Sequence, residues 1–446
     1  MSESSTFPEN FNQRMKIKLG EGFAAFIAGM QETPPTSIRL NPRKPISKFD
    51  TDEKVPWCQT GRYLPTRPSF TFDPLFHAGT YYVQEAASMF VEQAWKRINP
   101  VNKAIRVLDL CAAPGGKSTH LLSLMSDDSL LVSNELIPNR NAVLRENITK
   151  WGQANCIVTQ NNPSDFTKLG EYFDVILVDA PCSGEGMFRK DKNAIHEWSE
   201  KNVAQCSLRQ HDILKNAISV LKPGGYIIYS TCTFEQDEND APIAYCINEC
   251  GLKPISIDFP GITKTPRGLQ FYPHLNKGEG FYIALMQKPN NEAVSLDAAV
   301  KNYTHNADVA ATATPFLEDK EAFVIFKRGE LIFAIPKFTF QSYQWINSHL
   351  FVKQAGILVG EQKGKDLIPA HAMSLSVHLN KYIPRIEINE LQSIAYLKCE
   401  SIKINSDIRG WAVVTFNHHP LGWIKLMDNR ANNYYPREWR ILKDKA

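Results

Sequence analysis

The sequence predicts an α/β protein built around a mainly parallel, doubly wound sheet. Short apolar runs alternate with amphipathic stretches between about residues 79 and 288, and such alternation implies right-handed βαβ crossovers. A glycine-rich turn, Cys111–Lys117, follows one of these runs. Two later runs are followed by the cysteines Cys182 and Cys232. Because the carboxyl ends of parallel strands form the ligand-binding edge of such sheets, all three features are expected at one site.

The individual elements follow from periodicity and turn signals. Asn139–Trp151 and Glu197–Leu221 have helical periodicity, and Pro223-Gly224-Gly225 ends the second helix. A late run, Gly280–Met286, predicts a strand that pairs antiparallel at the sheet edge. Five short apolar runs are expected to be buried strands: Arg106–Leu110, Leu130–Ser133, Cys156–Thr159, Asp174–Val178 and Tyr226–Ser230.

The chain length predicts more than one domain. At 446 residues the chain exceeds the usual size of a single domain. Residues 1–78 form an N-terminal extension rich in proline and aromatic residues, with a short basic segment, Ser37–Lys44, that suggests RNA binding. The α/β domain spans 79–288, a small and polar stretch at 289–315 resembles a linker, and 316–446 is a second globular unit.

Composition excludes several classes of protein. The net charge is only +3, from 50 basic and 47 acidic residues, so nucleic-acid binding must rely on local basic surfaces. No run of about eighteen apolar residues is present, and the polar N-terminus argues against a membrane span or a signal peptide. Nine scattered cysteines suit a reducing cytoplasm. Without a Cys-x-x-Cys pair, and with Cys246 and Cys250 isolated, we expect no metal site.

The segment Val107–Ser118 has the form of a strand, a tight turn and a helix start. Its glycines let the backbone approach a ligand, and the helix N-terminus offers free N–H groups. Asp109 and Glu135 end the first two strands, where an acidic residue commonly holds ribose hydroxyls. A phosphate-binding P-loop is disfavoured, because it needs glycine where this chain has Cys111. S-adenosylmethionine, a nucleoside with a charged tail, is the cofactor that fits best.

Two cysteines beside such a cofactor suit methyl transfer to cytosine. Carbon C5 of cytosine becomes nucleophilic only after a thiolate adds to C6, and the adduct must later lose a proton and expel that thiolate. One cysteine as nucleophile and one that assists release therefore fit this chemistry. Asp179, just before Cys182, is a candidate to hydrogen-bond or protonate the ring edge. The alternative is that both cysteines are simply small buried side chains.

These motifs resemble a known family. The segments Cys111–Lys117, Asp179–Gly186 and Ser230–Thr233 are similar to the signatures of Nop/Sun RNA (cytosine-C5) methyltransferases. The likeness covers about residues 30–288 and includes further segments at Tyr82–Met89, Phe271–His274 and Gly278–Phe281. It implies a Rossmann-like class I methyltransferase domain with a mainly parallel seven-stranded sheet, S-adenosylmethionine as cofactor and RNA as partner.

The resemblance also implies residue roles. Cys232 would be the nucleophile, and Cys182 would help to release the product. After the third strand many members carry Asp, whereas this chain has Asn161 and Asn162; we place the adenine contact at Asn162, with Asp165 as the alternative. The implied cofactor-binding residues are Cys111, Ala112, Ala113, Pro114, Gly115, Gly116, Lys117, Glu135, Asn162 and Asp179. Downstream of Cys182, Arg189 or Lys190 is a candidate for contact with a substrate phosphate.

The C-terminal segments Pro420–Lys425 and Asn429–Arg440 resemble the tail of the RsmF-type bacterial members. Those proteins carry an α+β PUA-like RNA-binding unit and modify cytosine in the decoding region of 16S rRNA. Aromatic residues interleaved with Lys425, Arg430 and Arg437 suit base stacking and phosphate contact, although they would also suit an edge strand that packs the small unit.

The function expected from these features is formation of 5-methylcytosine in 16S rRNA, within the 30S particle and in the cytoplasm. A tRNA cytosine-C5 methyltransferase and a non-catalytic ribosome-assembly factor remain the alternatives. Nucleotide hydrolysis is disfavoured by the incomplete P-loop. The intact glycine turn and the presence of both cysteines weigh against the hypothesis of a non-catalytic assembly factor.

Overall fold

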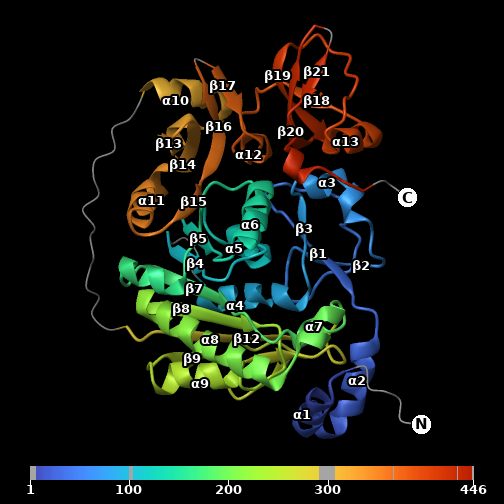
Figure 1. The fold of residues 1–446 in the computed structure, drawn as a ribbon, viewed down its shortest axis with the longest axis vertical. Helices are drawn as coiled ribbons and strands as arrows, with labels where there is room; N and C mark the ends of the chain where they lie inside the picture. The colour runs from blue at the N-terminus through green and yellow to red at the C-terminus, as the bar shows by residue number, and fades with distance from the viewer. Residues whose placement is uncertain (1–6, 100–103, 291–306, 365, 429, 444–446) are drawn as a thin grey trace.

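The computed structural model describes residues 7–99, 104–290, 307–364, 366–428 and 430–443. A ten-stranded sheet forms its centre, in the order β10-β11-β12-β8-β7-β4-β5-β6-β15, with β9 paired to β12 (Figure 1). The run β8-β7-β4-β5-β6 is parallel. The strands are β4 (Arg106–Asp109), β5 (Leu130–Asn134), β6 (Cys156–Thr159), β7 (Phe173–Asp179), β8 (Leu221–Thr231), β9 (Lys253–Ile255), β10 (Thr263–Lys264), β11 (Leu269–Phe271), β12 (Phe281–Gln287) and β15 (Val352–Ala355).

The expected α/β fold and the five expected parallel strands are confirmed. The late strand β12 is antiparallel to β8, as expected, but it does not lie at the sheet edge, because β11 pairs with its other side. The sheet also has ten strands where seven were expected. One of the additional strands, β15, belongs to the C-terminal unit and pairs antiparallel with β6, so the C-terminal unit extends the central sheet.

Helices cover both faces of the sheet. One face packs against α8 (Glu200–Val220), α9 (Asp240–Asn248) and α11 (Lys337–His349). The other packs against α4 (Val91–Ile98), α5 (Gly116–Leu124) and α6 (Pro138–Trp151). The helix expected from Glu197 begins at Glu200 instead, because the short helix α7 (Lys192–Glu197) ends at Glu197. The Ser199 hydroxyl accepts a bond from the Asn202 N–H and caps the start of α8.

The N-terminal extension packs onto this core. It contains α1 (Glu9–Leu19), α2 (Phe23–Gln31), α3 (Pro74–His77) and the antiparallel sheet β2-β1-β3, formed by β2 (Gly61–Leu64), β1 (Thr36–Leu40) and β3 (Tyr81–Val83). A buried hydrogen-bonded group, Cys58, Glu92 and His120, joins it to α4 and α5; the Cys58 Sγ lies 3.7 Å from the His120 Nε2, which lies 3.3 Å from a Glu92 oxygen.

Two of the three cations in the basic segment of the extension, Arg39 and Lys44, are buried. Arg39 is 0% exposed; its guanidinium stacks over Trp151 and donates to the Thr119 hydroxyl at 2.6 Å. The Lys44 ammonium is also buried and donates to the backbone carbonyls of Ala78 and Lys150. The expectation of RNA binding by this segment is therefore wrong for these two cations, because they bind the extension to the core instead.

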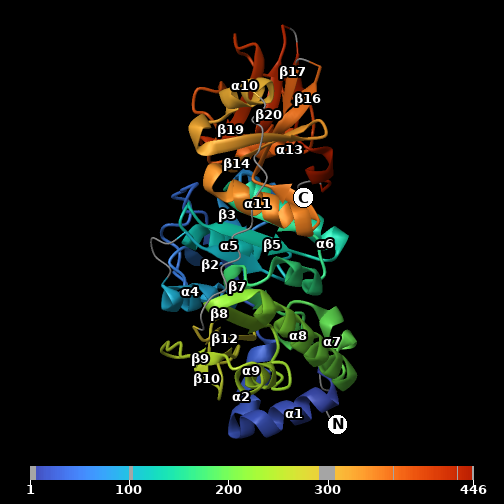
Figure 2. The same ribbon diagram turned by 90° about the vertical axis from the view of Figure 1, so that its left-hand side faces the viewer.

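The C-terminal unit holds two four-stranded sheets, β13-β14-β16-β17 and β18-β19-β20-β21. Figures 1 and 2 show it stacked on the end of the central domain beside α6, where its own strand β15 joins the central sheet. Its elements are α10 (Ala307–Ala313), β13 (Phe323–Arg328), β14 (Leu331–Pro336), α11, β15, β16 (Ile357–Lys363), β17 (Asp366–Pro369), α12 (His371–Leu375), β18 (Arg385–Glu387), α13 (Glu390–Leu397), β19 (Gly410–Phe416), β20 (His419–Leu426) and β21 (Ala431–Asn433).

The end of the expected linker belongs to this unit. Helix α10 buries Val309 and Ala310 in the same apolar cluster as Ile332 and Trp423. The remainder of the expected linker, residues 291–306, lies outside the described residues. Among the helices that the structure describes, none combines the length and the apolar character needed to cross a membrane.

Candidate active site

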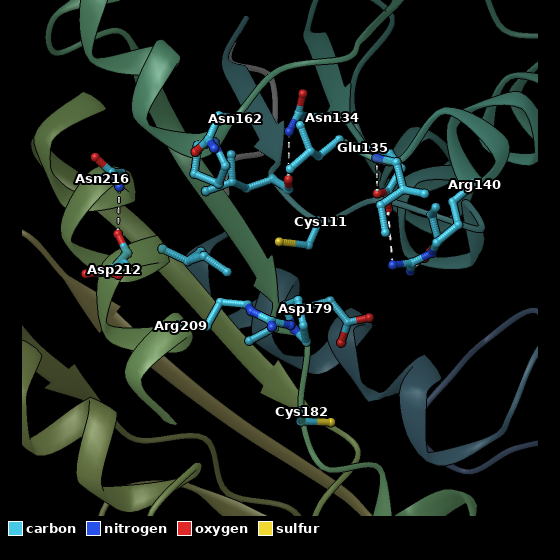
Figure 3. A pocket seen from close by; sticks show the side chains of 18 of the residues that line it. Cys111, Asn134, Glu135, Arg140, Asn162, Asp179, Cys182, Arg209, Asp212 and Asn216 are labelled. Carbon is cyan, nitrogen blue, oxygen red and sulfur yellow. Dashed lines mark hydrogen bonds and ion pairs between the residues drawn. The ribbon is translucent and has the colours of Figure 1, made fainter. Parts of the chain in front are cut away.

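The loops that follow the parallel strands converge on one pocket of about 710 Å³, and α8 forms its opposite wall (Figure 3). Seven of the residues expected at the site line this pocket: Cys111, Ala113, Glu135, Asn162, Asp179, Cys182 and Cys232. The lining residues that the sequence did not single out are Leu110, Asn134, Leu136, Ile137, Arg140, Pro163, Ala180, Pro181, Arg209, Asp212, Ile213 and Asn216.

The glycine turn shapes the pocket more than it lines it. Gly115 has φ +111°, a left-handed conformation that favours glycine, and helix α5 begins at the next residue. The Ala112 N–H donates to the Asn134 carbonyl at 2.8 Å, which ties the turn to the end of β5. Ala112, Pro114, Gly115, Gly116 and Lys117 are not among the lining residues; the first four set the backbone path from β4 into α5.

The end of β5 provides an acidic group beside an apolar wall. The Glu135 carboxylate accepts a 2.9 Å hydrogen bond from the Ile137 N–H, and Arg140 lies 3.5 Å from it. Leu136 and Ile137 are 48% and 49% exposed and line the pocket. A carboxylate next to exposed apolar side chains suits a nucleoside, which has ribose hydroxyls and a flat base.

The loop after β6 distinguishes the two candidates for the adenine contact. Asn162 lines the pocket, and its side-chain oxygen accepts a bond from the Ser164 N–H at the start of the 3₁₀ helix Pro163–Leu169. Asp165 is outside the lining and pairs with Lys168 at 3.0 Å. The geometry therefore favours Asn162.

The two cysteines meet at the far end of the pocket. The Sγ atoms of Cys182, after β7, and Cys232, after β8, lie 3.2 Å apart. The Cys232 N–H also points to the Cys182 sulfur at 3.4 Å. The hydrogen bond to the Cys232 sulfur, together with burial, raises the pKa of Cys182 well above its ordinary value, because both favour the protonated thiol. Near neutral pH Cys182 is therefore a thiol.

Asp179 lies between the cofactor end and the cysteines. Its Oδ2 atom lies 2.8 Å from the Lys117 ammonium, and its Oδ1 atom accepts a 2.7 Å bond from the Ser230 hydroxyl. Burial disfavours the charged form of Lys117, but the Asp179 carboxylate outweighs it and raises the pKa of Lys117. Lys117 thus contributes by holding Asp179 in place, with the carboxylate still facing the pocket.

Two buried glutamates hold the cysteine loops together. Glu238 accepts bonds from the Ser183 N–H at 3.0 Å and from the Gln210 amide at 2.8 Å. Glu185 accepts bonds from the Trp198 indole at 2.6 Å and from the Thr233 hydroxyl at 3.0 Å. Burial raises the pKa of both carboxyl groups. Glu185 lies within the family-like segment Asp179–Gly186, which predicts no role for it, and no sequence motif pointed to Glu238.

Arg189 or Lys190 was the candidate for contact with a substrate phosphate, and the structure contradicts this for Arg189. Its side chain is buried, with Nε 2.8 Å from a Glu279 oxygen and Nη2 2.6 Å from the Gly278 carbonyl. The guanidinium thus joins the segment after the Cys182 loop to the loop before β12. Lys190 remains more exposed, 3.5 Å from the other Glu279 oxygen.

The aromatic residues of the C-terminal tail divide into two groups. Trp423 and Tyr435 are buried; the Trp423 indole donates to the Ala370 carbonyl at 2.8 Å. For Trp423 and Tyr435, the alternative that the aromatic residues of the tail pack the small unit is therefore correct. Tyr434 is 36% exposed and packs edge to face on Trp411, which also lies 5.3 Å from the Lys425 ammonium. This second group keeps an aromatic and basic surface available for RNA.

Comparison with known proteins identifies the family. The model of "16S rRNA methyltransferase RsmB/F" matches residues 96–287. A curated relative, "Ribosomal RNA small subunit methyltransferase F" of Aeromonas salmonicida, is 30% identical over 93% of this chain and 92% of its own length. The chain belongs to the RsmB/F family of 16S rRNA methyltransferases. The family expected from the motifs is thereby confirmed.

The outer regions match RsmF in particular. The N-terminal domain of 16S rRNA methyltransferase RsmF matches residues 7–86, and the methyltransferase RsmF PUA domain matches 383–441. A relative with the same name from Shigella boydii is 28% identical over 97% of this chain and 96% of its own length. The chain is therefore an RsmF-type rRNA methyltransferase that uses S-adenosylmethionine and carries a PUA-like unit.

Two solved structures from Pyrococcus horikoshii share the central fold. A methyltransferase homologue is 28% identical, has a TM-score of 0.55, and covers 63% of this chain and 95% of its own. NSun6 with SFG is 20% identical, has a TM-score of 0.55, and covers 64% of this chain and 100% of its own. At that identity, the second likeness supports the fold alone.

Proposed function

We propose that this RsmF-type enzyme forms 5-methylcytosine in the decoding region of 16S rRNA, within the 30S particle and in the cytoplasm, through a covalent bond between Cys232 and C6 of the base. The observation that carries this proposal is the cysteine pair: two sulfurs 3.2 Å apart that line one pocket with Asp179 and Glu135. A thiol pair beside a cofactor pocket provides both the nucleophile and the group needed for its release.

The residues present fit S-adenosylmethionine. Glu135 would accept bonds from the ribose hydroxyls, Leu136 and Ile137 would offer apolar surface to adenine, and Asn162 would contact the adenine; all four line the pocket. Together with Asp179 and the turn Cys111–Lys117, these residues are our proposed cofactor site. When bound, the cofactor supplies an electrophilic methyl group.

The reaction begins at Cys232. Its thiolate adds to C6 of cytosine, which places a negative charge on the ring and makes C5 nucleophilic. Asp179 accepts a hydrogen bond from the exocyclic amino group or, as its acid, protonates the ring edge, and it thereby orients the base. Carbon C5 then takes the methyl group and still carries its own hydrogen.

The state of Cys182 changes during this sequence. The Cys232 sulfur is the largest cause of its raised pKa. Once that sulfur is bonded to C6, it no longer carries a negative charge, so Cys182 loses its proton more easily. The Cys182 thiolate then removes the C5 proton and becomes a thiol again, while the C6–S bond breaks and Cys232 leaves as a thiolate. One proton is released to solvent for each methyl group transferred.

The test maps 5-methylcytosine by bisulfite sequencing after incubation of the protein and S-adenosylmethionine with unmethylated 30S particles, free 16S rRNA or tRNA. We expect a new signal in the decoding region of 16S rRNA, strongest with 30S particles. A signal in tRNA alone would mean that the substrate is tRNA, and the proposed chemistry would stay unchanged. If S-adenosylmethionine binds but no signal is seen anywhere, the chain acts as a non-catalytic assembly factor.

A further inference from the structure

Arg209 is a basic side chain in the pocket that the described structure leaves without a hydrogen-bond or ion-pair partner. The other basic groups at this site are engaged: Arg140 donates to the Ala113 carbonyl at 3.0 Å and lies 3.5 Å from Glu135, and Lys117 pairs with Asp179 at 2.8 Å. Figure 3 shows Arg209 extending from α8 into the pocket on the side of Asp179 and Cys182.

The backbone that carries Arg209 is fixed to the cysteine loops. The next residue, Gln210, is buried, and its amide donates to the Pro181 carbonyl at 2.9 Å and to Glu238 at 2.8 Å. Two residues earlier, the Ser207 hydroxyl donates to the Asp237 carbonyl at 2.8 Å. Because these bonds flank Arg209 on both sides, they fix the backbone from which its side chain extends toward the Cys182 loop.

Asp212 does not neutralise this cation in the structure. It lies three residues further along α8 and also lines the pocket, a spacing at which opposite charges often pair, yet no ion pair joins the two side chains within the described residues. The hydrogen bond that joins Asp212 to Asn216, at 2.8 Å, uses the backbone carbonyl of Asp212 and not its carboxylate. The Arg209 guanidinium therefore keeps its five N–H donors available.

We infer that Arg209 binds a backbone phosphate of the RNA strand that delivers the target nucleotide to Cys232. This inference rests on the proposed function. A guanidinium binds a phosphate with two parallel charge-assisted hydrogen bonds. The other oxyanion at this site would be the cofactor carboxylate, which belongs with the proposed cofactor site at the turn Cys111–Lys117, from which Cys111 and Ala113 line the pocket. Arg209 lies on the α8 wall beside the cysteines, so its ligand is the RNA strand and not the cofactor.

The test compares Arg209→Ala, Arg209→Lys and Lys215→Ala, with initial rates at several salt concentrations. Lys215 is the matched control, because it is an exposed cation on the same helix and does not line the pocket. We expect Arg209→Ala to raise KM for the RNA substrate about tenfold or more and to reduce the slope of log affinity against log salt by about one unit. Arg209→Lys should restore the salt slope and part of the affinity, and Lys215→Ala should match the wild type.

Calorimetry of each variant with S-adenosylmethionine distinguishes whether Arg209 binds an RNA phosphate or the carboxylate of the cofactor. An unchanged cofactor affinity in Arg209→Ala, together with a weaker RNA affinity, supports the inference and shows that the variant is folded. Weaker cofactor binding with unchanged KM for RNA would overturn it and assign Arg209 to the carboxylate. An unchanged RNA KM and salt slope would also overturn it. Failure of the proposed function itself would appear differently, as absence of 5-methylcytosine with the wild-type protein.

Discussion

The two ends of the pocket are built in different ways. The cofactor end is formed largely by main-chain turns at strand ends, which Asn134 joins: its carbonyl accepts from the Ala112 N–H, and its side-chain amide donates to the carbonyls of Leu110 and Asn161. The cysteine end depends on buried ionisable side chains. Glu185 and Glu238 hold the two cysteine loops together, and the pair Lys117–Asp179 fixes the group between the two ends.

This difference indicates how each end responds to substitution. A pocket wall made of backbone loses one contact when one side chain is removed, so cofactor affinity should fall in modest steps. A buried carboxylate that several donors point to leaves all of them unpaired when it is changed. The cysteine end should therefore lose catalysis sharply, while cofactor binding persists.

The largest effect is expected for Cys232→Ala. This variant lacks the thiolate that activates C5, so methyl transfer to 16S rRNA should fall below detection, while S-adenosylmethionine binds with its normal affinity by calorimetry. Cys250→Ala is the matched control, because Cys250 is a partly exposed cysteine outside the pocket. Normal activity in Cys232→Ala would remove Cys232 from the role of nucleophile.

A smaller but still large effect is expected for Glu238→Gln. The substitution keeps the shape but places an amide donor where Ser183 and Gln210 already donate. The Cys182 loop should shift, and kcat should fall about ten- to hundredfold, because small misplacements of catalytic groups are costly. Calorimetry should show unchanged cofactor affinity. Equal losses in kcat and in cofactor affinity would mean that the two ends are not independent.

A change at the cofactor end should act differently. Glu135→Ala removes the carboxylate expected to hold the ribose, so KM for S-adenosylmethionine should rise about tenfold, with kcat at saturating cofactor nearly unchanged. Glu197→Ala is the control, since Glu197 is exposed on α7 and does not line the pocket. A collapse of kcat at saturating cofactor would contradict the contrast between the two ends.

The smallest expected effect is a shift in the pH at which Cys182 is alkylated. A raised pKa keeps Cys182 as an unreactive thiol to higher pH, so iodoacetamide should label it slowly at pH 7 and faster as the pH rises. Because the Cys232 sulfur is the largest cause of that raised pKa, Cys232→Ala should move the labelling profile of Cys182 to lower pH. Peptide mass spectrometry measures the labelling of Cys182 against pH in the wild type and in Cys232→Ala. Identical profiles would contradict the proposed effect of Cys232 on the pKa of Cys182.

The sequence predicted which strand ends meet at the pocket, because apolar runs of four or five residues followed by Cys111, Glu135 and Asn162 mark strand ends that must meet at one edge of the sheet. Which of these residues bind the cofactor stays a prediction. The α8 wall was not predictable in this way. Arg209, Asp212 and Asn216 resemble an ordinary polar helix face, and periodicity does not reveal which strand ends that face covers.

Contacts between distant segments account for the other differences. Glu238 was missed because its partner Ser183 is 55 residues away. Arg39 and Lys44 looked like exposed cations, although Trp151 and the Lys150 carbonyl, more than a hundred residues later, bury them. The alanines of α10 resembled a linker because small side chains occur in both settings; their burial depends on β13 and β14 packing against them.

The most direct test of the covalent mechanism uses Cys182→Ala. The enzyme is incubated with unmethylated 30S particles and S-adenosylmethionine, and the products are separated on a denaturing gel. Because this variant retains Cys232 but lacks the group that removes the C5 proton, we expect a protein–RNA adduct, with mass spectrometry locating the bond at Cys232. Free 5-methylcytosine product at the normal rate, with no adduct, would contradict the account.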